Sequence, residues 1–240
     1  MQETRPATRS RPGSLRPVEP DPSLLNPFPE LRRLFALVRA ALSGGRRPWL
    51  GIAMGTASVV VWLLLRTHSV GPPLWRSGAV YASLPLSSEV VRLPMSLFLP
   101  TPYLPVWGAA AQLVLVLGIA EMLIGRWVTI AVAAVGHVAS TLTARVVIES
   151  IHGSLFGLTP ATAHMLDTGP SAAATAVGAF LLLVLGLKRC AVLLTVSLLV
   201  AAFFIPGIDG VEHMIALACG FVAAALLPRL FLKVPAAEEL

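Results

Sequence analysis

Charged side chains are scarce in this sequence of 240 residues. Asp, Glu, Lys and Arg together make up 12% of it, whereas a soluble domain carries about a quarter. Hydrophobic residues make up 56%, and the mean hydropathy is +0.80. These values exclude an ordinary soluble domain and indicate a polytopic membrane protein.

Cysteine is almost absent as well. Cys190 and Cys219 are the two cysteines, and they fall in separate apolar runs without the close spacing of metal ligands. We therefore expect two small buried hydrophobic side chains and no metal site formed by these cysteines. We also expect no cleavable signal peptide, because the first long apolar run begins only near residue 48.

The net charge of +6 is concentrated toward the N-terminus, since nine of the eighteen Lys and Arg residues precede residue 48. This placement is typical of a cytoplasmic tail beside an anionic membrane, and it argues against a nucleic-acid partner. Residues 1–47 are expected to form an Arg/Pro-rich tail with one short helix, at about 30–42, lying on the inner leaflet. The apolar face of that helix comprises Leu31, Leu34, Phe35, Val38 and Leu42, with Arg32, Arg33 and Arg39 away from it.

Six apolar runs follow, and a membrane span needs about 20 apolar residues. They cover roughly 48–66, 105–124, 128–149, 170–187, 190–205 and 211–232. The predicted fold is all-α: a six-span bundle over residues 48–232, with both termini cytoplasmic and a short tail at 233–240. The excess of basic residues in the inner segments supports this orientation. The first outer loop, about 67–104, is semi-apolar, and we expect it to be buried against protein.

Two polar residues are predicted to lie at the same shallow depth below the outer surface. Ser171 falls in the first turn of the fourth predicted span and His213 in the first turn of the sixth, and both spans run inward. Small residues follow each at helical spacing, with Gly178 and Gly220 seven positions further on, so the two helices are expected to pack closely. Histidine is the usual base for a serine nucleophile. The pattern predicts a Ser–His dyad, and an ordinary helix-start serine is the alternative.

The start of the fourth span also carries helix-start residues. Asp167 and Thr168 are expected to cap the helix, and Pro170 suits its first position, where a missing N–H costs nothing.

Several short motifs accompany these residues in order along the chain. They are Trp75-Arg76 in the first outer loop, G-I-A-E-M-L-I-G-R-W at 118–127, G-P-S-A at 169–172 and I-D-G-V-E-H-M-I-A-L-A-C-G-F at 208–221. Together they resemble the motifs of rhomboid intramembrane serine proteases, over about residues 48–232. The resemblance implies a six-span fold in which Ser171 attacks peptide bonds of transmembrane substrates near the outer face. It also implies that His213 acts as the base, without a cofactor.

The sequence departs from the rhomboid pattern around the expected oxyanion. Ala172 stands where the family has a second glycine, and Pro105 and Ala109 occupy the places of a His and an Asn in the second span. Backbone N–H groups near Gly169 and Ala172, and the side chain of Gln112 one turn deeper, are then the candidate oxyanion donors. A catalytically inactive rhomboid-like protein that binds transmembrane clients is the second hypothesis, and a small permease is the third.

The remaining polar groups are expected to be structural. His137, near the middle of the third span, is expected to hydrogen-bond to a neighbouring helix, and a proton-relay role is the alternative. Glu121 and Arg126, near the inner end of the second span, are expected to form a structural ion pair or to contact lipid head groups.

His152 and His164 are expected to be solvated loop residues, and a metal site that they form with His213 is the alternative. The expected partners are transmembrane protein substrates or clients and the lipid bilayer. The expected location is a bacterial inner membrane. The sequence leaves the oligomeric state open.

Overall fold

Helices make up the regular secondary structure of the residues that the computed structural model describes, which are 27–100, 105–150, 160–167, 169–204 and 207–227. One isolated β-bridge, between Val80 and Asp167, is the exception within these ranges. The all-α prediction is confirmed. In chain order the elements are α1 (Phe28–Ser43), α2 (Trp49–Leu65), α3 (Gly71–Gly78), α4 (Leu86–Ser96), α5 (Val106–Gln112), the π-helical η2 (Leu113–Leu117), α6 (Gly118–Ile124), α7 (Arg126–Ser150), the 3₁₀-helical η3 (Pro160–His164), α8 (Ser171–Val184), α9 (Lys188–Phe204) and α10 (Ile208–Leu226).

Three helices of the described chain are long and apolar enough to cross a membrane: Val106–Ile124, Arg126–Ser150 and Ile208–Leu226. The first of them is the continuous run of α5, η2 and α6. Helices also occupy the other three predicted spans, but α2 and α8 are shorter, with 17 and 14 residues. The structure therefore indicates a membrane protein. The predicted end of the sixth span, beyond residue 227, and the C-terminal tail lie outside the described residues.

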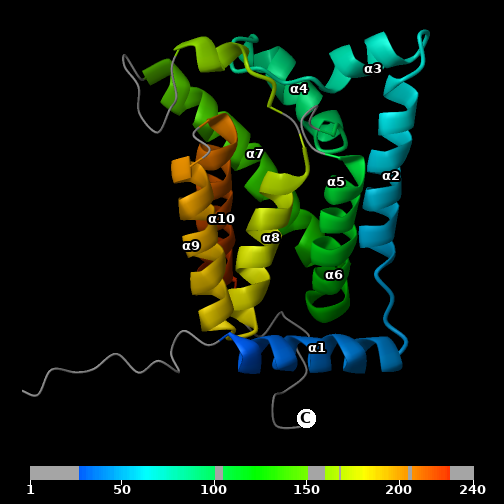
Figure 1. Cartoon of the computed structure of the whole chain (residues 1–240), viewed down its shortest axis with the longest axis vertical. Helices are drawn as coiled ribbons and strands as arrows, with labels where there is room; N and C mark the ends of the chain where they lie inside the picture. Colours follow the sequence, from blue (N-terminus) through cyan, green and yellow to red (C-terminus); the bar gives the residue numbers. More distant parts are fainter. Residues whose placement is uncertain (1–26, 101–104, 151–159, 168, 205–206, 228–240) are drawn as a thin grey trace, which may run out of the picture.

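Helix α8 lies in the middle of the bundle (Figure 1). It packs against α7 and α10 and also against the run of α5, η2 and α6. Nine of its fourteen residues are buried, and five of those nine are alanines. Small side chains allow the neighbouring backbones to approach closely. A Cβ atom at Gly136 of α7 would lie only 2.2 Å from the Cβ of Ala176 in α8.

Two glycines set the sharp reversals between consecutive helices. Gly125 ends α6 with a φ of +93°, and Gly186 separates α8 from α9 with a φ of +71°. Side chains rarely adopt this left-handed region, so glycine is favoured at both positions. Each reversal turns the chain back along the bundle.

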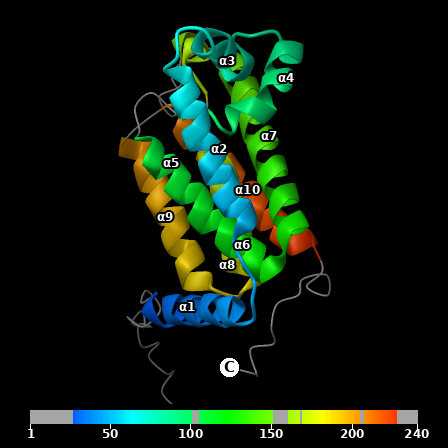
Figure 2. The ribbon, with the colours of Figure 1, turned by 90° about the vertical axis from the view of Figure 1, so that its right-hand side faces the viewer.

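Helix α1 lies across one end of the bundle (Figures 1 and 2), and its predicted existence is confirmed. The predicted apolar face was partly wrong. Leu37 and Ala41 are the buried residues of α1, whereas Phe35 is 70% exposed and Leu42 is 40% exposed. The bundle contacts a face centred near Leu37, which leaves Phe35 on a different side of the helix. Leu31, Leu34 and Val38 are partly buried against the main core, as expected.

Glu30 joins α1 to the start of α9. Its carboxylate accepts hydrogen bonds from the backbone N–H groups of Arg189, at 3.1 Å, and Cys190, at 2.9 Å. These N–H groups have no partner within their own helix, and a carboxylate at a helix N-terminus is favoured. Burial raises the pKa of Glu30, but the N–H donors outweigh it and hold the pKa below its ordinary value of 4.5.

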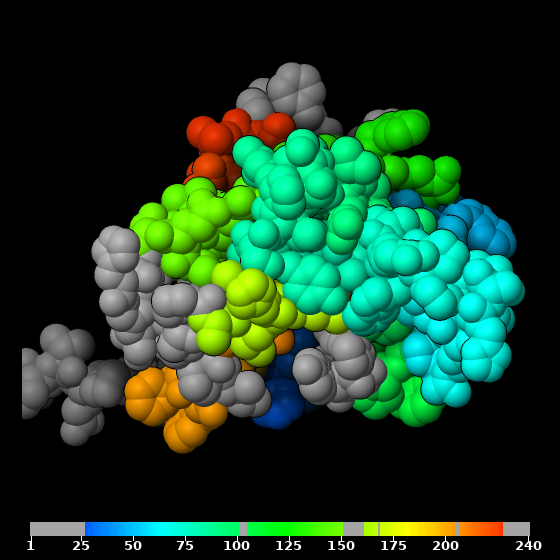
Figure 3. Space-filling model, turned by 90° about the horizontal axis from the view of Figure 1, so that it is seen from above, coloured from blue at the N-terminus to red at the C-terminus, as the bar shows by residue number. Residues whose placement is uncertain are grey.

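The opposite end of the bundle is covered by the outer cap, which we define as residues 71–99 with α3 and α4. In Figure 3 it spreads over much of the face seen from above. Val80, Leu93 and Leu99 are at most 3% exposed. The prediction that this loop is buried against protein is confirmed in part, because Leu86 and Val91 are 54% and 78% exposed and residues 101–104 lie outside the described residues.

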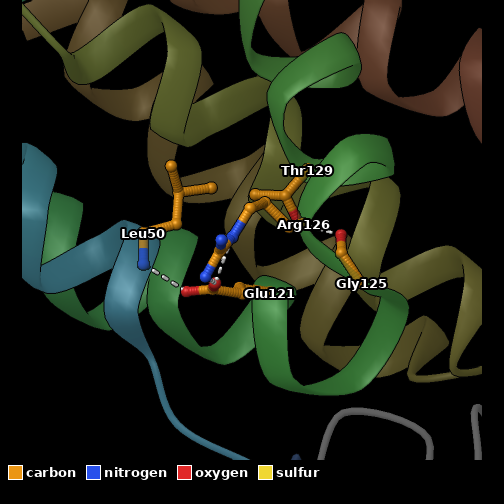
Figure 4. A network of polar contacts seen from close by, with 5 residues as sticks. All are labelled: Leu50, Glu121, Gly125, Arg126 and Thr129. Carbon is orange, nitrogen blue, oxygen red and sulfur yellow. Dashed lines mark hydrogen bonds and ion pairs between the residues drawn. The ribbon is translucent and has the colours of Figure 1, made fainter.

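The predicted ion pair of Glu121 and Arg126 is also confirmed (Figure 4). A nitrogen of the Arg126 guanidinium lies 2.8 Å from Oε1 of Glu121, and Oε2 of the same carboxylate accepts the backbone N–H of Leu50. Beside it, the hydroxyl of Thr129 donates to the carbonyl of Gly125. The carboxylate thus joins the start of α2 to the turn between α6 and α7, which is a structural role.

Candidate active site around Ser171

Ser171 is the first residue of α8, and two bonds to the outer cap hold the chain that leads to it. The N–H of Gly169 donates to the carbonyl of Ser96 at 3.1 Å, and the N–H of Asp167 donates to that of Val80 at 2.9 Å. Gly169 has a φ of +121°, which favours glycine. The serine side chain itself is half-buried. Its position therefore depends on the outer cap as well as on α8.

His137 anchors the outer cap to α7. Its Nε2 lies 2.9 Å from the hydroxyl of Ser96 and 3.3 Å from the carbonyl of Leu93. Both Ser96 and His137 are at most 5% exposed. The prediction of a hydrogen-bonded structural histidine is confirmed, with a partner in α4. The same Ser96 supplies the carbonyl that holds Gly169, two residues before Ser171.

The register between α8 and α10 is set at Gly220. A Cβ atom there would lie 2.3 Å from the carbonyl oxygen of Ala176 and 2.8 Å from the Cβ of Ala179. Helices α8 and α10 run in the same direction (Figure 1). His213 lies seven residues before Gly220, about 10 Å along the helix. Ser171 precedes Ala176 and Ala179 by about 8 and 12 Å. The two residues therefore lie at the same level.

His213 is half-buried and belongs to the second turn of α10, because the helix begins at Ile208. The prediction of a first-turn position was therefore wrong. Both Ser171 and His213 belong to the described chain, and no hydrogen bond joins them. The face of α10 that is most deeply buried carries Glu212, Ala216 and Gly220. His213 stands at the edge of that face.

Gly178 does not share the packing role of Gly220. A Cβ atom at Gly178 would meet Val116 of η2 at 3.9 Å and Leu194 of α9 at 4.0 Å, which are ordinary contacts. The predicted close approach of Gly178 to the sixth span is therefore corrected. Ala176 and Ala179 are the α8 residues that meet Gly220.

The expected oxyanion region lies where α5 passes α8. Ala174, one turn below Ser171, packs against Leu113 and Leu117 of η2. In α5, which runs in the same direction as α8, Ala109 lies one turn above Leu113. No polar side chain is present at Ala109.

The candidate oxyanion donors differ in their suitability. The N–H of Gly169 is already bonded to Ser96, so Gly169 supports the turn and is not a free donor. Ala172 is in the first turn of α8, where backbone N–H groups have no intrahelical acceptor. Gln112 is half-buried at the end of α5, and Pro105 is an exposed residue that precedes α5.

Asp167 does not cap α8. The N-cap residue is Pro170, and no side chain of the described residues caps the helix. Asp167 is instead 6% exposed and faces Glu212 of α10 and Thr141 of α7. Burial raises the pKa of Asp167, and the negative charges of Asp209 and Glu89 add to the effect. The capping prediction for Asp167 was wrong, and Thr168 lies outside the described residues.

Sequence reasoning missed Glu212. It is 5% exposed, and its Oε1 has no hydrogen-bond partner among the described residues. The available signal was a carboxylate directly before His213 at the start of an apolar run.

The other candidate residues add no chemistry to this region. His164 is exposed, as expected, and His152 lies outside the described residues. In the described part of the chain, no three His, Cys, Asp or Glu side chains form a group suited to a metal ion. Cys190 is buried as predicted, whereas Cys219 is only half-buried.

Comparisons of the chain with protein-family models, with curated proteins and with solved structures found no match.

Proposed function

We propose that this protein is a rhomboid-like intramembrane serine protease in which Ser171 is the nucleophile and His213 is the general base. The observation that carries the proposal is the register of α8 and α10 at Gly220, which brings both residues to one level of the bundle. The order of motifs along the sequence supports it. A six-span arrangement with cytoplasmic termini belongs to the same proposal.

The length of α8 supports a site below the outer surface. Its 14 residues extend for about 21 Å, whereas the hydrocarbon core of a bilayer is about 30 Å thick. If the end of α8 near α1 lies at the inner interface, Ser171 lies about 9 Å below the outer one. A transmembrane substrate would expose its scissile bond there by unwinding near its outer end.

The reaction follows the usual course for a serine nucleophile. The Oγ of Ser171 attacks the carbonyl carbon of the scissile peptide bond while His213 accepts the hydroxyl proton. The carbonyl oxygen becomes an oxyanion, which the N–H groups of the first turn of α8, including that of Ala172, are placed to stabilise. The C–N bond breaks as His213 protonates the leaving amine. Water then hydrolyses the acyl-enzyme with His213 again as the base.

A protein that binds transmembrane clients without cleaving them is the second candidate. Two observations favour it. No hydrogen bond joins the described side chains of Ser171 and His213, and Ala109 provides no polar side chain at the expected oxyanion position. Losing one oxyanion donor typically lowers a rate about 100- to 1000-fold.

A serine-directed fluorophosphonate probe tests the proposal on the purified full chain. We expect the wild type to be labelled, and Ser171→Ala and His213→Ala to lose the label. Ser140→Ala is the matched control, because it removes a buried hydroxyl from the neighbouring α7 and should keep the label. A wild type that neither reacts nor cleaves model transmembrane substrates would support the client-binding protein instead.

A further inference from the structure

Two buried carboxyl groups meet beside the candidate active site. Asp167 precedes α8 and is 6% exposed, and Glu212 belongs to α10 and is 5% exposed. Their side chains interact directly with each other and with the hydroxyl-bearing Thr141 of α7. The Oε1 atom of Glu212 has no hydrogen-bond partner in the described chain. A deeply buried carboxyl oxygen without a partner is costly, so the pair requires an explanation.

The surrounding charges do not neutralise the pair. On α7, Arg145 already forms ion pairs with Glu89 of α4 and with Glu149 of its own helix, at 2.9 Å for the latter. The further negative charges of Glu89 and of Asp209 in α10 act on the pair. Two carboxylates in contact and shielded from water cannot both be ionised. A proton between them would supply the donor that Glu212 lacks.

We propose that Asp167 and Glu212 share one proton, and that this acid–carboxylate hydrogen bond positions Ser171 against His213. Glu212 directly precedes His213, and Asp167 lies four residues before Ser171. The bond thus joins the chain leading into α8 to the second turn of α10. The N–H of Asp167 is held from the other side by Val80. The positioning role rests on the proposed function, whereas the shared proton does not.

The shared proton has a predictable effect on stability. Burial raises the pKa of Asp167 above its ordinary value of 3.8. At a pH between 3.8 and the raised pKa of Asp167, the folded chain holds a proton that the unfolded chain has released. Stability therefore falls as the pH rises, by about tenfold in the folding equilibrium per pH unit for one proton. At high pH both carboxyls ionise, repel each other and separate the two helix starts.

The shared proton is tested on the full chain in detergent, by measuring its thermal midpoint between about pH 5 and about pH 9. We expect the midpoint of the wild type to fall with rising pH and that of Glu212→Gln or Asp167→Asn to stay nearly constant, because an amide keeps the shape and a donor without ionising. Glu149→Gln is the control, since Glu149 is a 54% exposed carboxylate of the same region, and it should keep the wild-type slope. A slope that Glu212→Gln leaves unchanged would overturn the shared proton. So would an infrared carboxylic-acid C=O band that Glu212→Gln leaves unaltered at neutral pH.

The positioning role is tested by the pH profile of fluorophosphonate labelling. We expect the wild type to lose labelling at alkaline pH, Glu212→Gln to extend labelling to higher pH, and Glu212→Ala to lose at least tenfold in labelling rate at every pH. Equal profiles for all three overturn the positioning role even where the thermal slopes differ. No labelling of the wild type, with the thermal and infrared results as expected, would refute the proposed protease and leave the shared proton established.

Discussion

Replacing Gly220 by alanine should separate α10 from α8. The new Cβ would lie 2.3 Å from the carbonyl oxygen of Ala176, and real Cβ atoms essentially never come closer than 3.0 Å to such a neighbour. The contact must therefore open by at least 0.7 Å, the difference between these two distances. The carbonyl belongs to a buried helix backbone and cannot rotate away. Overpacking of this kind costs about 1–3 kcal/mol.

Gly178→Ala is the matched control for this prediction. Both glycines lie within helices, so both substitutions gain about the same 1 kcal/mol of helix propensity. At Gly178 the nearest atoms would lie 3.9 and 4.0 Å away, and no clash arises. The difference between the two variants therefore isolates the steric cost. At about 2–4 °C per kcal/mol, Gly220→Ala should melt roughly 2–12 °C below Gly178→Ala.

The assay is thermal unfolding of the purified chain in detergent, followed by tryptophan fluorescence. A second pair of variants tests the same geometry. Gly136→Ala would clash with the Cβ of Ala176, so adding Ala176→Gly should restore its stability. The same addition should not rescue Gly220→Ala, whose clash is with a backbone oxygen. Equal melting temperatures of Gly220→Ala and Gly178→Ala would refute the register of α8 and α10 on which the candidate dyad depends. Rescue of both Gly136→Ala and Gly220→Ala by Ala176→Gly would refute it as well.

Three further outcomes test the fold. Glu121→Ala should destabilise the protein by about 1–3 kcal/mol in thermal unfolding because it leaves the N–H of Leu50 without its acceptor, and Glu121→Gln, which keeps an acceptor oxygen, should cost less. Glu30→Ala should cost about 0.5–2 kcal/mol, as a lost helix cap does. Because the pKa of Glu30 is held below 4.5, the stabilisation by its carboxylate is complete above about pH 4.5 and is lost as the pH falls through the lowered pKa. If the wild type and Glu30→Ala lost stability equally in acid, this role of Glu30 would be contradicted. An apolar maleimide that partitions into the detergent should modify the half-buried Cys219 faster than the buried Cys190, as peptide mass spectrometry would measure, and the reverse order would contradict the packing of α9 and α10.

Much of the fold could be predicted because its signals are local. Apolar content predicted six long helical segments, and the structure has a helix at each of them. Glu121 and Arg126 are only five residues apart in the sequence, so their ion pair follows from short-range geometry. The helical period around Leu31 and Val38 correctly predicted α1.

The errors concern rotation about helix axes and contacts across the bundle. Each residue turns an α-helix by about 100°, so adjacent residues point in different directions and only the packing of the helix decides which of them meets the core. The packing of α10 places Glu212, and not His213, on its most buried face. Asp167 has the composition of a helix cap, but it contacts Glu212 because the bridge to Val80 directs the chain into the interior.

The sequence by itself determined that this is an all-helical membrane protein and where its long apolar helices lie, and it singled out Ser171 and His213 near the starts of two of them. Hydropathy and helical period depend on neighbouring residues, so they can be read without a structure. Only the tertiary structure decided that Gly220 rather than Gly178 sets the contact of α8 with α10. It also decided that Ser96 and His137 hold the turn before Ser171, and that Asp167 contacts Glu212. These contacts join residues far apart in the chain, and they depend on how each helix is rotated and inclined against its neighbours.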